Sequence, residues 1–322
     1  MQGAHSEREA VTSTAGDVFT QQRLFLTGQG WWDASSRGLI TVTGPDRLVW
    51  LHSLLTQDLL GLSPGVTTEA LVLSPQGKIE HSALITDDGT TCWLLPDPGH
   101  ANPLAAWLSS MVFRTDVTVD TPDLRVWGYW GSLGDEFSFP DAVEFADPWP
   151  RVGEGSVGYH SSAHPGEDWS LRYGVGPDIP ESAREDNRVS EEALEALMIA
   201  AGRPSAKDVD DKSLPHELDW LRTAVHLNKG CYRGQEAVAK VHNLGHPPRR
   251  LTLLHLDGSG STLPAPGDSV VDGETPIGFV TRAAWHYELG PVALAVIRRM
   301  ASEGEVSVTT RDGLSLAASQ EL

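Results

Sequence analysis

The sequence predicts an α+β fold that ends in a small antiparallel β-barrel or sandwich. Three observations support this prediction. Helix-type and strand-type apolar patterns are mixed along residues 21–246. After residue 246 only short strand-type runs follow, and glycine or proline turns separate them. The chain has 322 residues, which is enough for two or three domains that each bury a core.

The first third of the chain alternates strand and helix signals. Residues 45–59 begin with a proline, and leucines then recur at helical spacing, which predicts an amphipathic helix. A second helix is expected over residues 102–113, with Asn102 as its cap. Strands are expected at residues 39–44, 69–75, 79–86 and 91–96, the second and third forming a hairpin around Pro75-Gln76-Gly77.

The middle of the chain gives weaker signals. Residues 134–188 are rich in glycine, proline and acidic residues, so we expect loops and insertions there. Ser190 followed by glutamates predicts a helix over residues 190–201. Apolar residues on one face predict another over 214–226, and a third helix is expected over residues 234–243.

Composition restricts the possible functions. The chain carries 44 acidic and 24 basic residues, and its net charge of −20 repels phosphate backbones, so general nucleic-acid binding is not expected. No apolar run approaches the ~18 residues of a membrane span, and the first residues lack the apolar core of a signal peptide. The two cysteines lie far apart, and Cys92 sits in an apolar strand, so a reducing, cytoplasmic setting is expected.

The second cysteine, Cys231, lies in a setting typical of a reactive thiol. Lys229 and Arg233 stand two residues to either side, and Gly230 and Gly234 allow a tight, accessible backbone. The cations and the following helix start are expected to lower the pKa of the thiol. The alternative is an inert cysteine in an ordinary turn.

The residues around Cys231 also carry a family resemblance. The chain resembles the YgfZ branch of the GcvT-like, folate-binding proteins through a match to the signature K-G-C-Y-x-G-Q-E. Residues 44–59, 201–221 and 241–258 resemble further segments of that family, so the resemblance covers roughly residues 22–300. The matching residues are Lys229, Gly230, Cys231, Tyr232, Arg233, Gly234, Gln235 and Glu236.

This resemblance implies a three-lobed architecture around a central hole that accepts tetrahydrofolate. Residues 1–20 would be a disordered lead, 21–246 a folate-binding region of two intertwined α+β lobes, and 247–322 the C-terminal β-barrel. Proteins of this branch assist the assembly or maintenance of iron–sulfur proteins, including tRNA-modifying enzymes. The implied partners are iron–sulfur assembly proteins and their client enzymes, with Cys231 as the functional thiol and its neighbours shaping the loop.

Folate has a flat pterin, an aromatic bridge and a carboxylate tail, so its site needs aromatic walls, fixed polar groups and a cation. For each tryptophan, packing in the core is the plain alternative. The candidate contacts in the matching segments are Trp50, Glu80, His81, Trp220, Tyr232 and Arg249.

Two departures from the family pattern bear on catalysis. Aminomethyltransferases of the wider family use an aspartate in the first hairpin, where this chain has His81. The acidic residue of an R-x-E-x-G-type segment is replaced by Ala200. The sequence therefore favours an accessory factor over a folate-dependent aminomethyltransferase or demethylase that would use Glu80 or His81 as a base. A folate-sensing protein with a structural cysteine is a third hypothesis.

A resident metal is not expected. Two cysteines cannot supply the four thiolates of a usual iron–sulfur cluster. The histidine pairs at 242 and 246, and at 160 and 164, are better explained as solvated turns, because glycine and prolines interrupt the first pair's helix. No dinucleotide fingerprint, phosphate loop or serine-hydrolase elbow is present.

Overall fold

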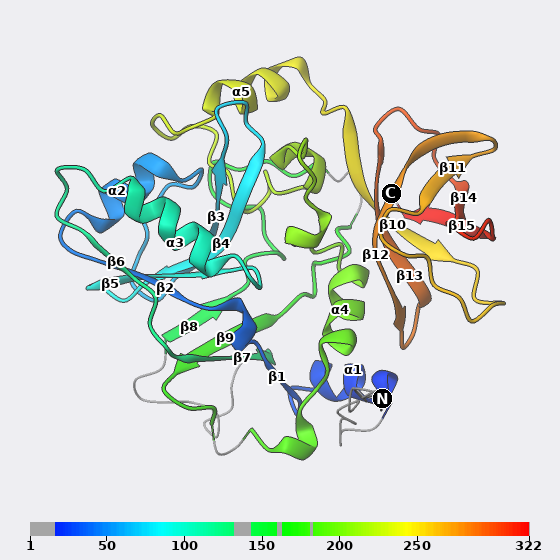
Figure 1. The fold of residues 1–322 in the computed structure, drawn as a ribbon, viewed down its shortest axis with the longest axis horizontal. Helices are drawn as coiled ribbons and strands as arrows, with labels where there is room; N and C mark the ends of the chain where they lie inside the picture. The colour runs from blue at the N-terminus through cyan, green and yellow to red at the C-terminus, as the bar shows by residue number, and fades with distance from the viewer. Residues whose placement is uncertain (1–16, 132–142, 160–162, 181–182, 322) are drawn as a thin grey trace, which may run out of the picture.

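The computed structural model describes residues 17–131, 143–159, 163–180 and 183–321. It contains two open antiparallel sheets, a closed barrel, and helices that pack between and over them (Figure 1). The expected α+β class and the C-terminal barrel are confirmed. None of the helices in the described ranges is long and apolar enough to cross a membrane.

The first sheet is built around the predicted hairpin. It has the order β3-β4-β5-β2-β6, and α2 (Arg47–Leu54) and α3 (Ala101–Ser110) pack against its core. The α2 helix ends five residues earlier than expected, and α3 is capped by His100, with Asn102 inside its first turn. The strands are β2 (Ile40–Thr43), β3 (Thr67–Leu73), β4 (Ile79–Asp87), β5 (Thr91–Pro96) and β6 (Thr118–Asp120).

The second sheet was not expected from the sequence. Its order is β1-β7-β9-β8, and two of these strands lie in the stretch expected to be loops. Helices α1 (Val18–Leu26) and α4 (Glu191–Ala200) pack against one another beside it. The expectation of a disordered lead is corrected for residues 18–20, because they belong to α1, which Asp17 caps. The strands are β1 (Trp31–Asp33), β7 (Arg125–Trp130), β8 (Val143–Ala146) and β9 (Leu171–Gly176).

The segment between α4 and the barrel departs most clearly from expectation. The helix expected over residues 214–226 is replaced by a short 3-10 turn, η5 (Pro215–Leu218), followed by further turns. Asp219 stops the helix because its backbone is left-handed, with φ 55°. The expected helix after the signature motif is present as α5 (Gln235–Leu244).

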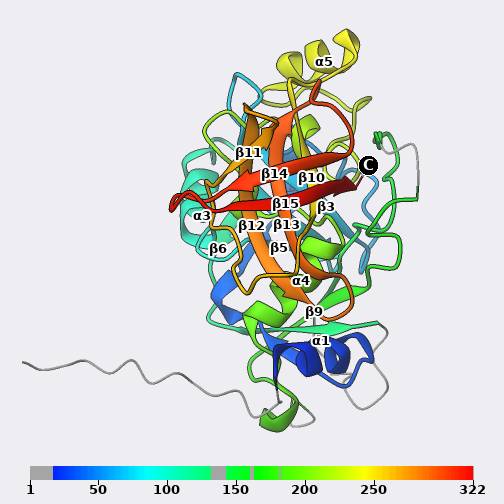
Figure 2. The same cartoon turned by 90° about the vertical axis from the view of Figure 1, so that its right-hand side faces the viewer.

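The barrel closes in the order β10-β13-β12-β11-β14-β15. It packs against α4, whose Ala196 and Ile199 share a buried cluster with barrel residues such as Leu294 (Figure 2). Short 3-10 turns lie elsewhere at η1 (Ser35–Arg37), η3 (Glu185–Asn187) and η4 (Ala206–Asp208). The barrel strands are β10 (Arg249–Leu256), β11 (Ser269–Asp272), β12 (Thr275–His286), β13 (Gly290–Arg298), β14 (Glu305–Thr309) and β15 (Ser315–Glu321).

Candidate functional site

The signature loop is held against the tip of the β3–β4 hairpin, where α5 begins (Figure 1). Gly77 in the hairpin turn and Gly234 at the start of α5 both have positive φ. A Cβ atom on Gly234 would lie 2.5 Å from the carbonyl oxygen of Ser74, so only glycine allows this approach. The result is a rigid base for a loop on which the Cys231 side chain is exposed.

Lys229 does not face the thiol as a free cation. Its side chain is buried, and Nζ donates hydrogen bonds to the carbonyl oxygens of Leu55 (2.7 Å) and Gln57 (2.9 Å) and to that of His52. The carbonyls of His52 and Leu55 lie at the C-terminal end of α2, where the last carbonyl groups of a helix have no donor within the helix. The carbonyl of Gln57 lies just beyond the helix. Burial lowers the pKa of Lys229 to about 8. Lys229 therefore anchors the signature loop to α2.

The other cation of the motif is also engaged. Arg233 forms a two-pronged ion pair with Glu80 on β4, with Nη1 to Oε2 at 2.9 Å and Nη2 to Oε1 at 3.3 Å. The Tyr232 ring is buried in the cluster that contains Trp220, and burial raises the pKa of Tyr232 to about 12. The expectation that both cations of the motif serve the Cys231 thiol is therefore corrected: one binds carbonyl groups and the other a carboxylate.

A histidine and a carboxylate missed by the sequence reading lie beside this loop. His52 Nδ1 is 3.1 Å from Asp58 Oδ1, and a Cβ atom on Gly230 would lie 3.7 Å from His52 Nε2. Burial, followed by the charge of Lys229, lowers the pKa of His52, although Asp58 opposes this change. Nothing in the spacing of the sequence indicated that α2 and the signature loop meet.

The six residues expected to contact folate do not line one cavity. Trp50 packs in the core of the first sheet, and Tyr232 packs in the cluster described above. Arg249 forms ion pairs with Asp210 and Glu217 at the start of the barrel. Glu80 is committed to Arg233.

His81 faces a second histidine rather than a carboxylate. His81 Nδ1 lies 3.5 Å from His100 Nδ1. Burial, with the neighbouring His100, lowers the pKa of His81 to about 4, so the ring is neutral near neutral pH.

An ion network fills the space between the two sheets and α4. Arg203 Nη2 lies 2.8 Å from Glu69 Oε1, and Arg203 Nε lies 2.9 Å from Asp147 Oδ2. The indole of Trp220 donates to the same Glu69 oxygen at 3.0 Å. The remaining cavity of about 10 Å³, which Trp220 and Met198 help to line, holds no more than a water molecule.

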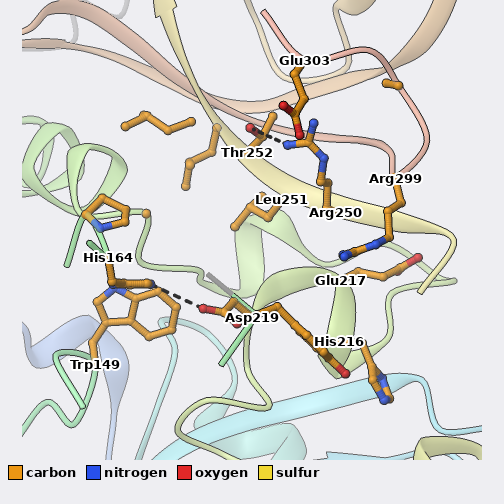
Figure 3. Close-up of a pocket in the computed structure, with 16 residues that line it drawn as sticks. Trp149, His164, His216, Glu217, Asp219, Arg250, Leu251, Thr252, Arg299 and Glu303 are labelled. Carbon is orange, nitrogen blue, oxygen red and sulfur yellow. Dashed lines mark hydrogen bonds and ion pairs between the residues drawn. The ribbon is translucent and has the colours of Figure 1, made fainter. Parts of the chain in front are cut away.

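A larger cavity of about 280 Å³ lies between the barrel and the rest of the molecule (Figure 3). Trp149, His164 and Asp219 lie on one side of it, while Arg250 and Arg299 lie on the barrel side. Apolar walls with a few convergent polar groups are typical of small-molecule sites. The full lining is Trp149, Tyr159, His164, Pro165, Gly202, His216, Glu217, Asp219, Arg250, Leu251, Thr252, Leu253, Leu294, Arg299, Ala301 and Glu303.

The polar groups of this cavity are held in place by their neighbours. His164 Nε2 lies 3.4 Å from Asp219 Oδ2, while His164 Nδ1 accepts the backbone N–H of Gly166 at 3.0 Å. The Trp149 indole donates to the carbonyl oxygen of Ala201 at 2.9 Å. The sequence reading missed this cavity, because its lining residues come from four distant segments of the chain.

The structure offers no resident metal site among the residues it describes. No group of three or more histidine, cysteine, aspartate or glutamate side chains there could hold a metal ion. His242 Nδ1 lies 3.5 Å from the Tyr159 hydroxyl, and His246 is exposed. His160 lies outside the described residues. Cys92 is buried, as expected, and burial raises the pKa of its thiol.

Comparison with solved structures identifies the class of fold. The crystal structure of glycine cleavage system aminomethyltransferase T from Bartonella henselae matches with a TM-score of 0.73 and 20% identity, over 95% of this chain and 88% of that one. The chain therefore has the aminomethyltransferase fold.

Sequence relatives define the resemblance further. An iron-sulfur cluster assembly factor IBA57 homolog, mitochondrial, from Phaeosphaeria nodorum is 26% identical over 71% of this chain, and the match covers 56% of that protein. An aminomethyltransferase from Moorella thermoacetica is 26% identical over 89% of this chain and 84% of its own length. No protein-family model matches. These findings confirm the expected resemblance to YgfZ/IBA57-type, GcvT-like proteins.

Proposed function

We propose that this protein is an accessory factor for the assembly or maintenance of iron–sulfur proteins, and that it acts through the Cys231 thiol. The observation that carries the proposal is the contrast within the signature loop. Lys229, Tyr232 and Gly234 are anchored to the molecule, whereas the cysteine between them is exposed. The relative from Phaeosphaeria nodorum, named as an iron–sulfur cluster assembly factor, supports the same role.

A single exposed thiol suits a transient contact. Thiolates are the usual ligands of iron–sulfur clusters, but stable clusters take four of them. The chain has only two cysteines, and Cys92 is buried. Cys231 therefore acts together with ligands from an assembly protein or a client enzyme. The clients include tRNA-modifying enzymes, and the setting is the reducing cytoplasm.

Folate, or a close derivative, binds in the cavity between the barrel and the other two lobes. Its volume of about 280 Å³ is near the lower end of the range of small-molecule sites. Trp149 offers an aromatic wall and Arg299 a cation for a carboxylate tail. Bound folate would supply a one-carbon carrier beside the barrel.

The experiment that tests the thiol is complementation. A bacterial strain that lacks its own protein of this type would express this chain as wild type, Cys231→Ser or Cys231→Ala. Its cluster-dependent tRNA methylthiotransferase would be assayed. We expect rescue by the wild type and loss of rescue by both variants at equal protein levels.

The matched control is Cys92→Ala, which removes the other thiol and should still rescue if it accumulates. Equal rescue by Cys231→Ala would make the exposed cysteine structural. Failure of the wild type itself would overturn the accessory role.

A folate-dependent aminomethyltransferase or demethylase is the second candidate, favoured by the match to aminomethyltransferases over most of the chain. In this case His81 would act as the base, since its lowered pKa leaves it neutral near neutral pH. Tetrahydrofolate-dependent transfer from an aminomethylated donor, assayed with wild type and His81→Ala, tests it. Activity that depends on His81 would establish the transferase.

A further inference from the structure

We propose that His81 and His100 form an exchangeable binding site for a divalent first-row transition metal ion of the Zn²⁺ type. The two side chains come from different elements, since His81 lies on β4 and His100 at the start of α3. The Nδ1 atoms of the two rings face one another. The site does not involve Cys231, so the inference goes beyond the proposed function and does not depend on it.

An irregularity in the first sheet places the side chain of His81. The pairing of β3 with β4 shifts register just before His81, so Glu80 is an extra residue on β4. Such a bulge changes the direction of the neighbouring side chains, and bulges are frequent beside functional sites. Here Glu80 binds Arg233 of the signature loop, whereas His81 contacts His100.

His100 occupies the position that usually caps a helix. It directly precedes α3, but its side chain forms no capping hydrogen bond. Its backbone is fixed on both sides, because its N–H donates to the Asp97 carbonyl and its own carbonyl accepts the Leu104 N–H, each at 3.0 Å. The imidazole is therefore held at a rigid corner of the chain and is directed at His81.

The distance between the two nitrogen atoms suits one shared metal ion. His81 Nδ1 lies 3.5 Å from His100 Nδ1, and the ring planes meet at 82°. Two Zn–N bonds of about 2.0–2.1 Å across this gap give an N–Zn–N angle of about 113–122°, which is close to the tetrahedral geometry of zinc. Imidazole is also a suitable ligand for nickel, copper and iron. An ion can therefore bind both rings after small rotations of the side chains.

Without metal, the two rings form a hydrogen bond. One Nδ1 carries a proton and donates it to the other Nδ1. A bound ion needs the lone pairs of both Nδ1 atoms, so this proton moves to Nε2 of the same ring. Neither ring has another hydrogen bond within the part of the chain that the structure describes, so no further contact has to break.

Two protein ligands make the site exchangeable. In the described ranges, no histidine, cysteine, aspartate or glutamate joins the pair as a third ligand. Both rings are half-buried, so water reaches the ion and completes its coordination. Structural zinc sites have four protein ligands, so this ion is held less tightly than a resident metal. While bound, it joins β4 to α3.

The test is calorimetry of the full chain with ZnCl₂. All proteins carry Cys231→Ser, because the exposed thiol would compete for zinc. We expect one high-affinity Zn²⁺, and we expect His81→Gln and His100→Gln each to weaken it at least tenfold. Loss of an outer partner of a metal ligand already costs about 10–100-fold in affinity, and these variants remove a ligand itself. His246→Gln removes an exposed histidine outside the pair and should leave Zn²⁺ binding unchanged.

Nitrogen NMR of the histidine side chains identifies the ligating atoms without any change to the pair. Zn²⁺ should shift the Nδ1 signals of both His81 and His100, and the two glutamine variants assign these signals. Urea unfolding without metal shows whether each variant is folded. Because the substitutions lie on different elements, one folded variant together with the NMR result is enough to test the pair.

A shift at only one of the two Nδ1 atoms would show that no ion is shared. Unchanged Zn²⁺ affinity in either folded variant would also overturn the site, as would failure of the Cys231→Ser protein to bind Zn²⁺. None of these results bears on the accessory role, which is tested separately through the Cys231 thiol.

Discussion

At the scale of single residues, Lys229 shows how a side chain beside the functional thiol can serve a different part of the molecule. Its ammonium group joins the signature loop to three carbonyls around the end of α2. We expect Lys229→Met, which keeps the aliphatic stem, to lower the free energy of unfolding by about 1–3 kcal/mol, because buried carbonyls lose their donor.

Urea unfolding at neutral pH measures this loss, and Lys240→Met on the exposed face of α5 is the control. The control should stay within about 0.5 kcal/mol of the wild type. Equal stability of the two variants would show that the carbonyls find other partners.

His216 makes the stability of the molecule depend on pH. It lies on η5 and is buried, and burial lowers its pKa to about 4. The unfolded chain therefore binds more protons between this pKa and the usual value of about 6.5, so the contribution is present above 6.5 and is lost on acidification. Between about pH 7.5 and about pH 5.5 we expect the wild type to lose about 1 kcal/mol more than His216→Gln. Parallel losses in urea unfolding at the two pH values would contradict this expectation.

At the scale of elements, the sequence predicted correctly those helices and strands whose formation depends on residues close together in the chain. Ser190 caps α4 through the Ala193 N–H, as its position before two glutamates predicts. The hairpin and the barrel strands also follow their sequence patterns. The helix expected over 214–226 ends at Asp219, whose backbone is left-handed. The Asp219 side chain lies 3.4 Å from His164, and no local pattern contains this contact between residues so far apart in the chain.

The junction between the hairpin and α5 depends on glycine at both sides. Gly234 and Gly245 bound the same helix, with φ 83° and 96°, but only Gly234 has neighbours where a Cβ would stand. Both alanine substitutions cost the left-handed penalty of about 1–2 kcal/mol. Gly234→Ala should cost at least about 1 kcal/mol more, because its Cβ meets the Ser74 carbonyl. Urea midpoints of the two variants compare them directly, and equal midpoints would mean that the hairpin tip moves aside freely.

At the scale of the whole molecule, the sequence did not indicate which segments far apart in the chain would pack together. The second sheet pairs β1 with β7, and Trp31 lies opposite Tyr129. The 280 Å³ cavity likewise forms only when the barrel docks. The signature motif around Cys231 could be recognised in the sequence because its residues are contiguous. The cavity is assembled from four separate segments of the chain, so no contiguous motif marks it.

A buried ion pair is one of the contacts that join the barrel to the rest of the molecule. Arg282 on β12 binds Asp208 of η4 with Nη2 to Oδ2 at 2.7 Å, and both side chains are almost fully buried. Arg282 Nη2 also donates to the Arg203 carbonyl at 2.6 Å. Removing one partner of a buried pair costs about 3–5 kcal/mol, because the other charge stays buried alone.

Arg282→Met should therefore weaken the packing of the barrel against α4, while the closed sheet of the barrel stays intact. Calorimetry should show one unfolding transition for the wild type and two for the variant, the second belonging to residues 247–322. Arg298→Met, at an exposed position of β13, is the control and should keep a single transition. A single transition at lower temperature for Arg282→Met would mean that the barrel folds only together with the other lobes. The proposed boundary at residue 246 would then divide one cooperative unit.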